Sequence, residues 1–185
     1  MKKYARRDFL KTAAVGTAAI AVLPSLTGLA GVARADGEDD GKRQFSFVVL
    51  MQSGTSEHRI LLNGGGFFGE GGVQGRGAFT HFRATGTTPP PIVGFGTWKA
   101  KRLVGFTEVG AFGSQQGGIL DLIVELRASN GTKLRNVEMK VVCNLGPSGT
   151  STGLDEQVRL SGGDLPLTFD THLAGLTLFS TKSPD

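Results

Sequence analysis

Residues 119–143 read Ile-Leu-Asp-Leu-Ile-Val-Glu-Leu-Arg-Ala-Ser-Asn-Gly-Thr-Lys-Leu-Arg-Asn-Val-Glu-Met-Lys-Val-Val-Cys. Apolar and polar residues alternate on both sides of Asn130-Gly131, which is typical of strands with one buried face. The Asn-Gly pair supplies the positive φ angles that a two-residue hairpin turn needs. The stretch therefore predicts antiparallel strands over 119–128 and 133–143, and their inward residues are Leu120, Leu122, Val124, Leu126, Ala128, Val137, Met139, Val141 and Cys143.

The same pattern continues through the rest of the chain after residue 35. Short runs of Phe, Val, Leu and Thr are punctuated by glycine, and no amphipathic helix pattern occurs, so the fold class is all-β. A single antiparallel barrel is favoured over the alternative, a two-sheet sandwich, because long consecutive strands would otherwise leave exposed edges. The expected strands cover 44–51, 58–63, 77–85, 96–109, 119–128, 133–143, 157–160 and 173–180.

Residues 63–77 stand out because eight of these fifteen residues are glycine. One interpretation is an anion-binding or ligand-clasping loop, in which bare backbone comes close to a bound group. The favoured interpretation is a wide hairpin whose glycines form bulges and sharp bends. No phosphate-binding motif of the G-x-x-x-x-G-K-[ST] type is present.

The first 35 residues have a basic start, a mildly apolar stretch over 12–32 and the small-residue ending Ala33-Arg34-Ala35. The run Arg6-Arg7-Asp8-Phe9-Leu10-Lys11 resembles the twin-arginine (Tat) export motif. This resemblance implies recognition by the Tat translocase, cleavage after Ala35, and passage of the folded protein to the periplasm, the cell surface or the medium. An uncleaved membrane anchor is the alternative, which Pro24 and three glycines in the apolar stretch disfavour.

Removing residues 1–35 changes the charge of the protein. They hold six of the 20 basic residues and one of the 16 acidic residues, so 14 basic and 15 acidic residues remain and the net charge falls from +4 to −1. A nucleic-acid partner is not expected, because it requires a basic field. Residues 36–43 read as a disordered acidic linker, and 44–185 as one β domain. Its single cysteine, Cys143, permits no intramolecular disulfide.

The three histidines, His58, His81 and His172, are candidate metal ligands in the alternative, metal-dependent interpretation. Their wide spacing in the sequence neither builds nor excludes a site. Asp170 and His172 share a strand face, so the carboxylate could orient that imidazole as a general base. Neither pattern assigns a cofactor.

Four residues are candidates for ligand contact inside the barrel: Trp98, Arg102, Phe106 and His58. In a regular strand over 96–109, Arg102 shares its face with Trp98, Ala100, Val104 and Phe106, and a charge on the inner face needs a carboxylate such as Glu108 or a bound ligand. The alternative is a bulge at Gly105, or a frayed strand end, that turns Arg102 outward.

The segment Gly96-Thr97-Trp98 resembles the short G-x-W motif of lipocalins, which implies a calycin-like or similar meander barrel that holds a small molecule. The preferred function is therefore an exported, non-enzymatic binding or structural protein, with a small apolar ligand as the candidate cargo. The alternative is a small barrel enzyme, an isomerase, cyclase or metal-dependent catalyst, that uses His, Glu and Arg in the cavity.

Overall fold

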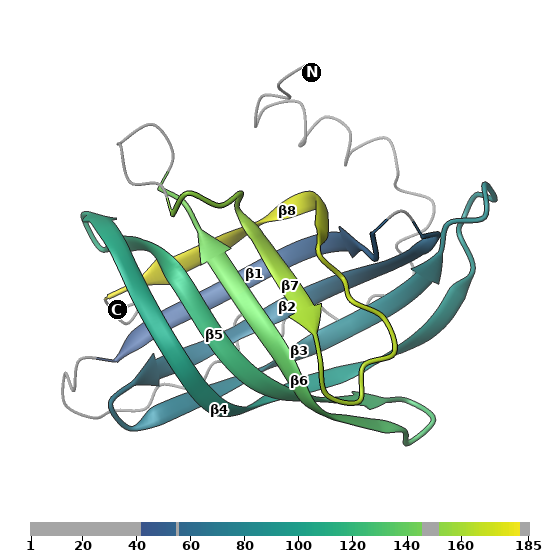
Figure 1. Cartoon of the computed structure of the whole chain (residues 1–185), viewed down its shortest axis with the longest axis horizontal. Coiled ribbons are helices and arrows are strands. Elements are labelled where there is room, and N and C mark those ends of the chain that lie inside the picture. Colours follow the sequence, from purple (N-terminus) through teal and green to yellow (C-terminus); the bar gives the residue numbers. More distant parts are fainter. Residues whose placement is uncertain (1–41, 55, 146–151, 182–185) are drawn as a thin grey trace, which may run out of the picture. The chain divides into compact units, whose positions relative to one another are not determined.

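The computed structural model describes residues 42–54, 56–145 and 152–181 (Figure 1). The predictions made for residues 1–41, which concern the signal, its cleavage, the anchor and the acidic linker, lie outside these residues. Within the described part, no helix has the length and apolar character needed to cross a membrane. The described residues form strands β1 (Arg43–Gln52), β2 (His58–Gly69), β3 (Gly72–Arg83), β4 (Ile92–Phe112), β5 (Gln115–Ala128), β6 (Lys133–Cys143), β7 (Gln157–Ser161) and β8 (Thr171–Ser180).

All eight strands belong to one antiparallel sheet in the order β4-β3-β2-β1-β8-β5-β6-β7. An additional pairing joins β4 to β5, so the pairings run in a ring from β1 through β5 and back through β8. Figure 1 shows the strands curving round toward one another, and their buried hydrophobic residues form one core cluster. The all-β fold and the single antiparallel meander are therefore confirmed, and the sheet is continuous as a barrel requires.

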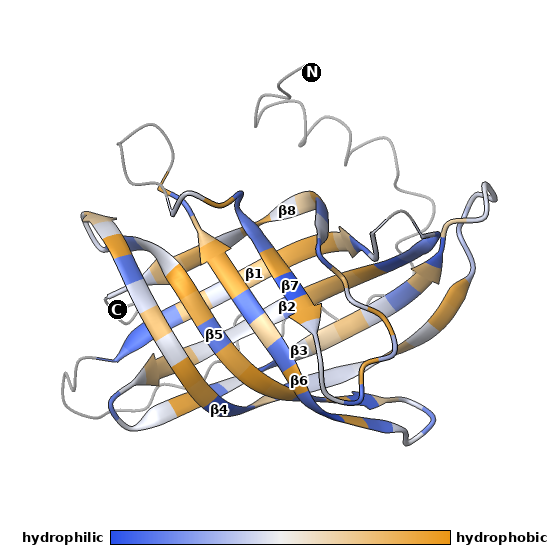
Figure 2. Cartoon of the chain, viewed as in Figure 1, coloured by the Kyte–Doolittle hydropathy of each residue, from blue (hydrophilic) through white to orange (hydrophobic). Residues whose placement is uncertain are grey.

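The core lies on the inner face of this sheet. The predicted inward residues of β1, Phe45, Phe47, Val49 and Met51, are each at most 1% exposed. Apolar and polar bands alternate along β5 and β6 in Figure 2, and the apolar positions predicted for both strands are buried except for half-buried Ala128. The hairpin between β5 and β6 forms where predicted, but its turn differs: Ala128 N bonds Thr132 O, so three residues, 129–131, form the loop. In this loop only Gly131 has a positive φ, at +88°, so the predicted two-residue turn with positive φ at both Asn130 and Gly131 is wrong.

The glycine-rich stretch is not the wide hairpin that the sequence predicts. β2 and β3 pair through the whole stretch to Gly69 and Gly72, so only two residues form the turn. A Cβ atom at Gly64 would lie 2.6 Å from Cζ2 of Trp98, and one at Gly75 would lie 2.8 Å from Cζ of Phe45. These glycines allow large aromatic side chains and neighbouring backbone to pack closely.

Strand β4 departs from regular alternation at three points, between Ala100 and Arg102, between Leu103 and Gly105, and between Glu108 and Gly110. Each irregularity shifts the phase of the side chains that follow it. Trp98 and Ala100, which precede the first irregularity, and Phe106, which follows the second, face the core, as predicted. Arg102 and Val104 are exposed, so the predicted inner-face position of both is wrong.

Candidate functional site

One end of the closed sheet is covered by the segment between β7 and β8. Gly163 adopts φ +56°, and a Cβ atom there would collide with the carbonyl oxygens of Arg135 and Asn136. Asp164 then anchors the segment to β6, because its carboxylate accepts a hydrogen bond from Arg135 N at 3.0 Å and its own N–H donates to Arg135 O. At the other end Phe169 pairs with Leu160 of β7 through two backbone hydrogen bonds.

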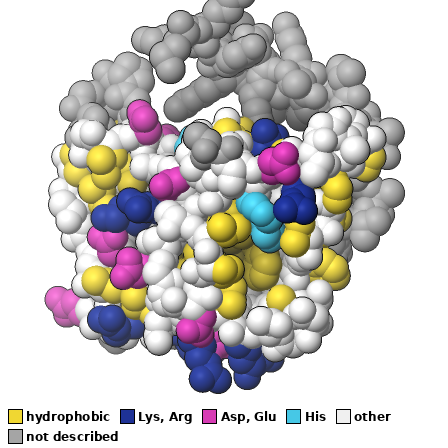
Figure 3. All heavy atoms as spheres, turned by 45° about the vertical axis from the view of Figure 1, so that its right-hand side comes forward, with side chains coloured by type: hydrophobic (Ala, Val, Ile, Leu, Met, Phe, Trp, Pro, Cys, Tyr) yellow, Lys and Arg dark blue, Asp and Glu magenta, His cyan; other side chains and the backbone are white. Residues whose placement is uncertain are grey.

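Between these anchors the segment roofs a small apolar hollow. Its volume is about 80 Å³. Strands β2, β3, β5 and β6 form the floor, and the covering segment supplies half-buried leucines and a proline. Figure 3 shows histidine at the edge of a hollow lined with hydrophobic side chains, with basic and acidic side chains beside it. The lining residues are Ile60, Phe79, His81, Leu126, Leu134, Leu165, Pro166, Leu167 and Phe169.

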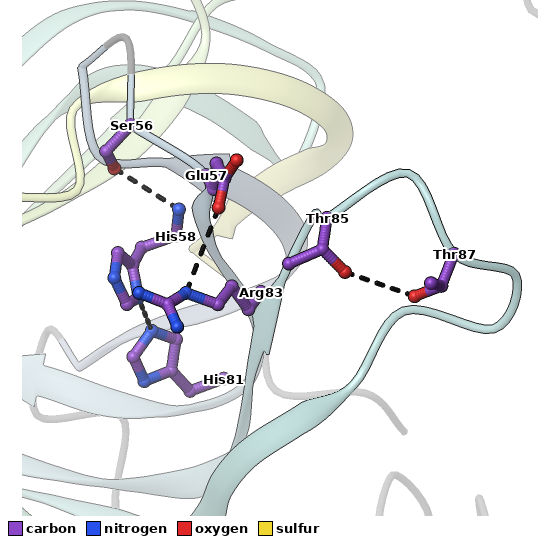
Figure 4. A network of polar contacts seen from close by, with 7 residues as sticks. All are labelled: Ser56, Glu57, His58, His81, Arg83, Thr85 and Thr87. Atoms are coloured by element: carbon purple, nitrogen blue, oxygen red, sulfur yellow. Dashed lines mark hydrogen bonds and ion pairs between the residues drawn. The ribbon is translucent and has the colours of Figure 1, made fainter.

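Two imidazoles meet at the rim of the hollow. His81 is paired in register with Ile60, so His58 lies on the same inner face, one diagonal step away across the β2–β3 ladder. His58 Nδ1 and His81 Nε2 are 2.9 Å apart, a hydrogen bond drawn in Figure 4. The His81 ring also contacts the Phe169 ring edge-to-face, with centroids 5.7 Å apart. His81 therefore links the hollow to His58.

The surroundings of His81 favour the neutral form of its imidazole. Burial lowers the pKa of His81 below its usual value of 6.5, and the proximity of His58 lowers it further. In a neutral pair, one ring donates to the other, so the pair presents one free N–H and one bare nitrogen to other groups. Such a pair can bind a hydroxyl or carboxyl group, or it can move a proton.

A charged pair lies beside the histidines. Arg83 is the direct cross-strand partner of His58 in the β2–β3 register, so both side chains are on the same face of the ladder. The Nε atom of Arg83 lies 3.8 Å from a carboxylate oxygen of Glu57, and both side chains are more than half exposed (Figure 4). An exposed ion pair at this distance is weak, so the guanidinium is available to another anion.

The third histidine does not join this pair. His172 is paired in register with Met51 of β1, and Met51 is paired with Ile60, so the Met51 strand separates His172 from the β2–β3 pair. Its Nε2 atom is buried without a hydrogen-bond partner. Among the described residues, no three His, Cys, Asp or Glu side chains form a group that could hold a metal ion. The structure thus brings together two of the three predicted metal ligands.

Asp170 does not orient His172. Its carboxylate accepts hydrogen bonds from Gly54 N at 3.3 Å and from the Thr171 hydroxyl at 3.5 Å. The predicted general-base dyad is therefore not formed between Asp170 and His172.

Cys143 lies in the core, where burial raises the pKa of its thiol above 9.0. The thiol is thus in the buried setting that its strand phase predicts.

Trp98 and Phe106 fill the interior where the sequence analysis places a ligand. The Trp98 ring stacks on Phe47 with centroids 5.6 Å apart, and its Nε1–H donates to Asn63 O at 2.8 Å. Phe106 packs against Phe68, with centroids 4.8 Å apart, and against Phe179. The middle of the closed sheet is thus packed with aromatic rings, and the apolar hollow lies at its end.

Arg102 lies on the outer face instead of the inner one. The irregularity after Ala100 points the Arg102 side chain outward, where it lines an open groove of about 430 Å³ across the outside of β4–β7. Its expected partner Glu108 bonds Arg43 at 3.1 Å. Lys140 and Asp121 also line the groove and pair at 3.1 Å, so the charges of the groove are largely matched.

Sequence reasoning missed two parts of the site. Arg83 falls inside a strand that was expected to run on to residue 85, and nothing local marks its position beside a histidine. The covering segment carries a usable signal: Leu165, Leu167 and Phe169 alternate with other residues, so they share a face that needs burial. Pro166 within this run disfavours a regular strand, because proline lacks the backbone N–H that a ladder needs.

Comparison with known proteins identifies the start of the chain. Residues 3–22 match the family model for the TAT (twin-arginine translocation) pathway signal sequence. No curated protein and no solved structure matches the chain. The predicted Tat signal is therefore confirmed, and the protein is exported across the membrane.

Proposed function

We propose that the β domain is an exported binding protein that holds the apolar part of a small molecule in the hollow between the β2–β3 ladder and the 162–170 segment. The observation that carries this proposal is the hollow itself, an apolar depression that ends at a hydrogen-bonded histidine pair. Binding sites of this kind combine an apolar lining with a few polar groups that orient the ligand. The domain would do this work in the periplasm, at the cell surface or outside the cell.

The size of the hollow limits the ligand. At about 10–15 Å³ for each water-sized group, 80 Å³ takes roughly five to eight groups such as methylenes. Burying about five methylenes is worth about 4 kcal/mol, so the dissociation constant of an aliphatic chain alone is no lower than about 1 mM, since association also costs entropy. Tighter binding therefore requires polar contacts at the rim.

Native mass spectrometry of the exported protein, followed by calorimetric titration with 1-hexanol and with hexanoate, tests the proposal. We expect a co-purified small molecule or measurable binding of a six-carbon probe, and loss of binding in Leu165→Trp, in which the indole fills the hollow. Leu154→Trp is the control, because Leu154 is an exposed loop residue that does not line the hollow. Equal binding by both variants, or no binding by the wild type, would contradict the proposal.

A second candidate function is acid–base catalysis by the same pair. The observation that favours it is the 2.9 Å contact between two imidazoles, one of them with a lowered pKa, at the edge of a water-poor hollow. Such a pair can remove a proton from one carbon and return it to another, as an isomerase or cyclase requires. Chemical conversion of the released ligand by the wild type and not by His81→Asn, followed by NMR, would favour catalysis over simple binding.

A further inference from the structure

The rim of the hollow carries more hydrogen-bond donors than a purely apolar ligand can use. His58 is flanked by His81 on the diagonal and by Arg83 directly across the ladder, so three nitrogen-bearing side chains gather (Figure 4), and His81 connects them to the hollow that it lines. The other residues that line the hollow, Leu165, Pro166 and Leu167 among them, are apolar. A molecule in the hollow is therefore surrounded by apolar side chains and meets the basic side chains where it reaches His81.

We propose that the ligand is a short-chain carboxylic acid, with its hydrocarbon chain in the hollow and its carboxylate bound by Arg83 and the His58–His81 pair. This inference rests on the proposed binding function and adds the chemical class of the ligand. A guanidinium is suited to a carboxylate because its planar fork of N–H donors matches the two oxygens. Glu57 holds Arg83 only through a long, exposed contact, so a ligand carboxylate can replace it.

The histidine pair makes the binding of an anion dependent on a proton. In the neutral pair one imidazole nitrogen is bare and repels a carboxylate oxygen. When the pair takes one proton from solvent, the hydrogen bond between the rings remains and both outer nitrogens become N–H donors. The anion then meets a positive charge. An alcohol can bind the neutral pair, because its hydroxyl group both donates and accepts a hydrogen bond.

Other charged groups near this end act in known directions. Arg83 and Glu57 lie next to His58 in the sheet and form an ion pair at 3.8 Å, so their opposite charges partly offset each other there. The Asp170 carboxylate is engaged by Gly54 N and Thr171, and His172 is separated from the pair by the Met51 strand. A bound carboxylate adds a negative charge next to the imidazoles, which favours the uptake of one proton.

Calorimetric titration of the exported protein with hexanoate and with 1-hexanol at pH 5.5 and pH 7.5 tests this inference. We expect hexanoate to bind at least tenfold more tightly than 1-hexanol at pH 5.5, since hydrogen bonds to charged groups are worth about ten- to hundredfold in affinity. Its affinity should fall toward pH 7.5, by up to tenfold per pH unit, while that of 1-hexanol stays constant. Arg83→Gln should lose most of the preference for hexanoate and keep the binding of 1-hexanol.

Arg159→Gln is the matched control, because it removes the same charge from an exposed position on the outer face. Equal affinities for hexanoate and 1-hexanol would overturn the assignment of a carboxylate and leave the proposed binding function standing. A hexanoate preference that Arg83→Gln and Arg159→Gln reduce equally, or that is unchanged by pH, would also overturn it. Absence of binding by both probes would overturn the inference and the proposed function together.

Discussion

We expect the substitution Gly77→Ala to destabilise the domain strongly. Among the glycines of β3 and β4 with ordinary φ, Gly77 is the one where an alanine should cost the most. The new Cβ atom would lie 2.7 Å from Cα of Gly64 and still closer to Asn63 O and to Nε1 of Trp98. Two of these neighbours are backbone atoms of the adjacent strand β2, which cannot rotate away. The β2–β3 ladder would have to open at this point.

The cost follows from the contacts that such an opening disturbs. Overpacking a core by one methyl group costs about 1–3 kcal/mol. The same shift breaks the hydrogen bond from Trp98 Nε1 to Asn63 O, worth about 1 kcal/mol. We therefore expect a loss of about 3 kcal/mol in the free energy of unfolding, which corresponds to a decrease in Tm of about 10 °C for a domain of this size.

Urea denaturation followed by tryptophan fluorescence measures this loss directly, because Trp98 is the one tryptophan in the chain. The control is Gly94→Ala on β4, where no atom lies within 4 Å of the added Cβ and the backbone φ is ordinary. That variant should be unchanged or stabilised by up to about 1 kcal/mol. If Gly77→Ala costs less than about 1 kcal/mol, or no more than Gly94→Ala, the proposed role of the glycine-rich strands is refuted.

Three further predictions follow from groups described above. Stability should decrease as the pH falls below about 6.5, because the folded state lowers the pKa of His81 and so favours its neutral form; His81→Phe should flatten this part of a Tm-against-pH curve. Stability should also decrease as the pH rises above about 9, because burial raises the pKa of Cys143 and the unfolded chain loses the thiol proton first. Cys143→Ala should remove this dependence on pH. The wild-type thiol should react with a thiol reagent only on unfolding. Asp164→Ala should cost about 1 kcal/mol in urea denaturation through the lost bond to Arg135 N, whereas the exposed Asp155→Ala should cost nothing measurable.

The strands were predictable from the sequence because their alternation is local. The place of the hairpin at 129–131 follows from its turn residues, although the loop is one residue longer than the predicted two-residue turn. The run Phe45, Phe47, Val49 and Met51 follows from the two-residue period of a strand. The twin-arginine signal was equally local, since the residues that match its family model lie in one continuous segment, 3–22.

The site was less predictable because register and bulges are set by the neighbouring strands. Nothing near Arg102 shows that β4 skips a position after Ala100, and that skip decides which face the guanidinium takes. The contact between His58 and His81 depends on the β2–β3 register, which in turn depends on a two-residue turn inside a run of glycines. Residues separated by 23 positions meet only after that register is known.

The pairing of β1 with β8 also bears on the timing of export. Gln44 and Ser180 are partners in this ladder, although nearly the whole domain lies between them in the sequence. A sheet that closes through such distant contacts has a high contact order and forms slowly, and its last pairing has to wait for the final strand to leave the ribosome. A translocase that threads a nascent chain would separate β1 from its partner. The Tat route accepts a protein after synthesis is complete, so it suits a domain whose first strand is held by its last.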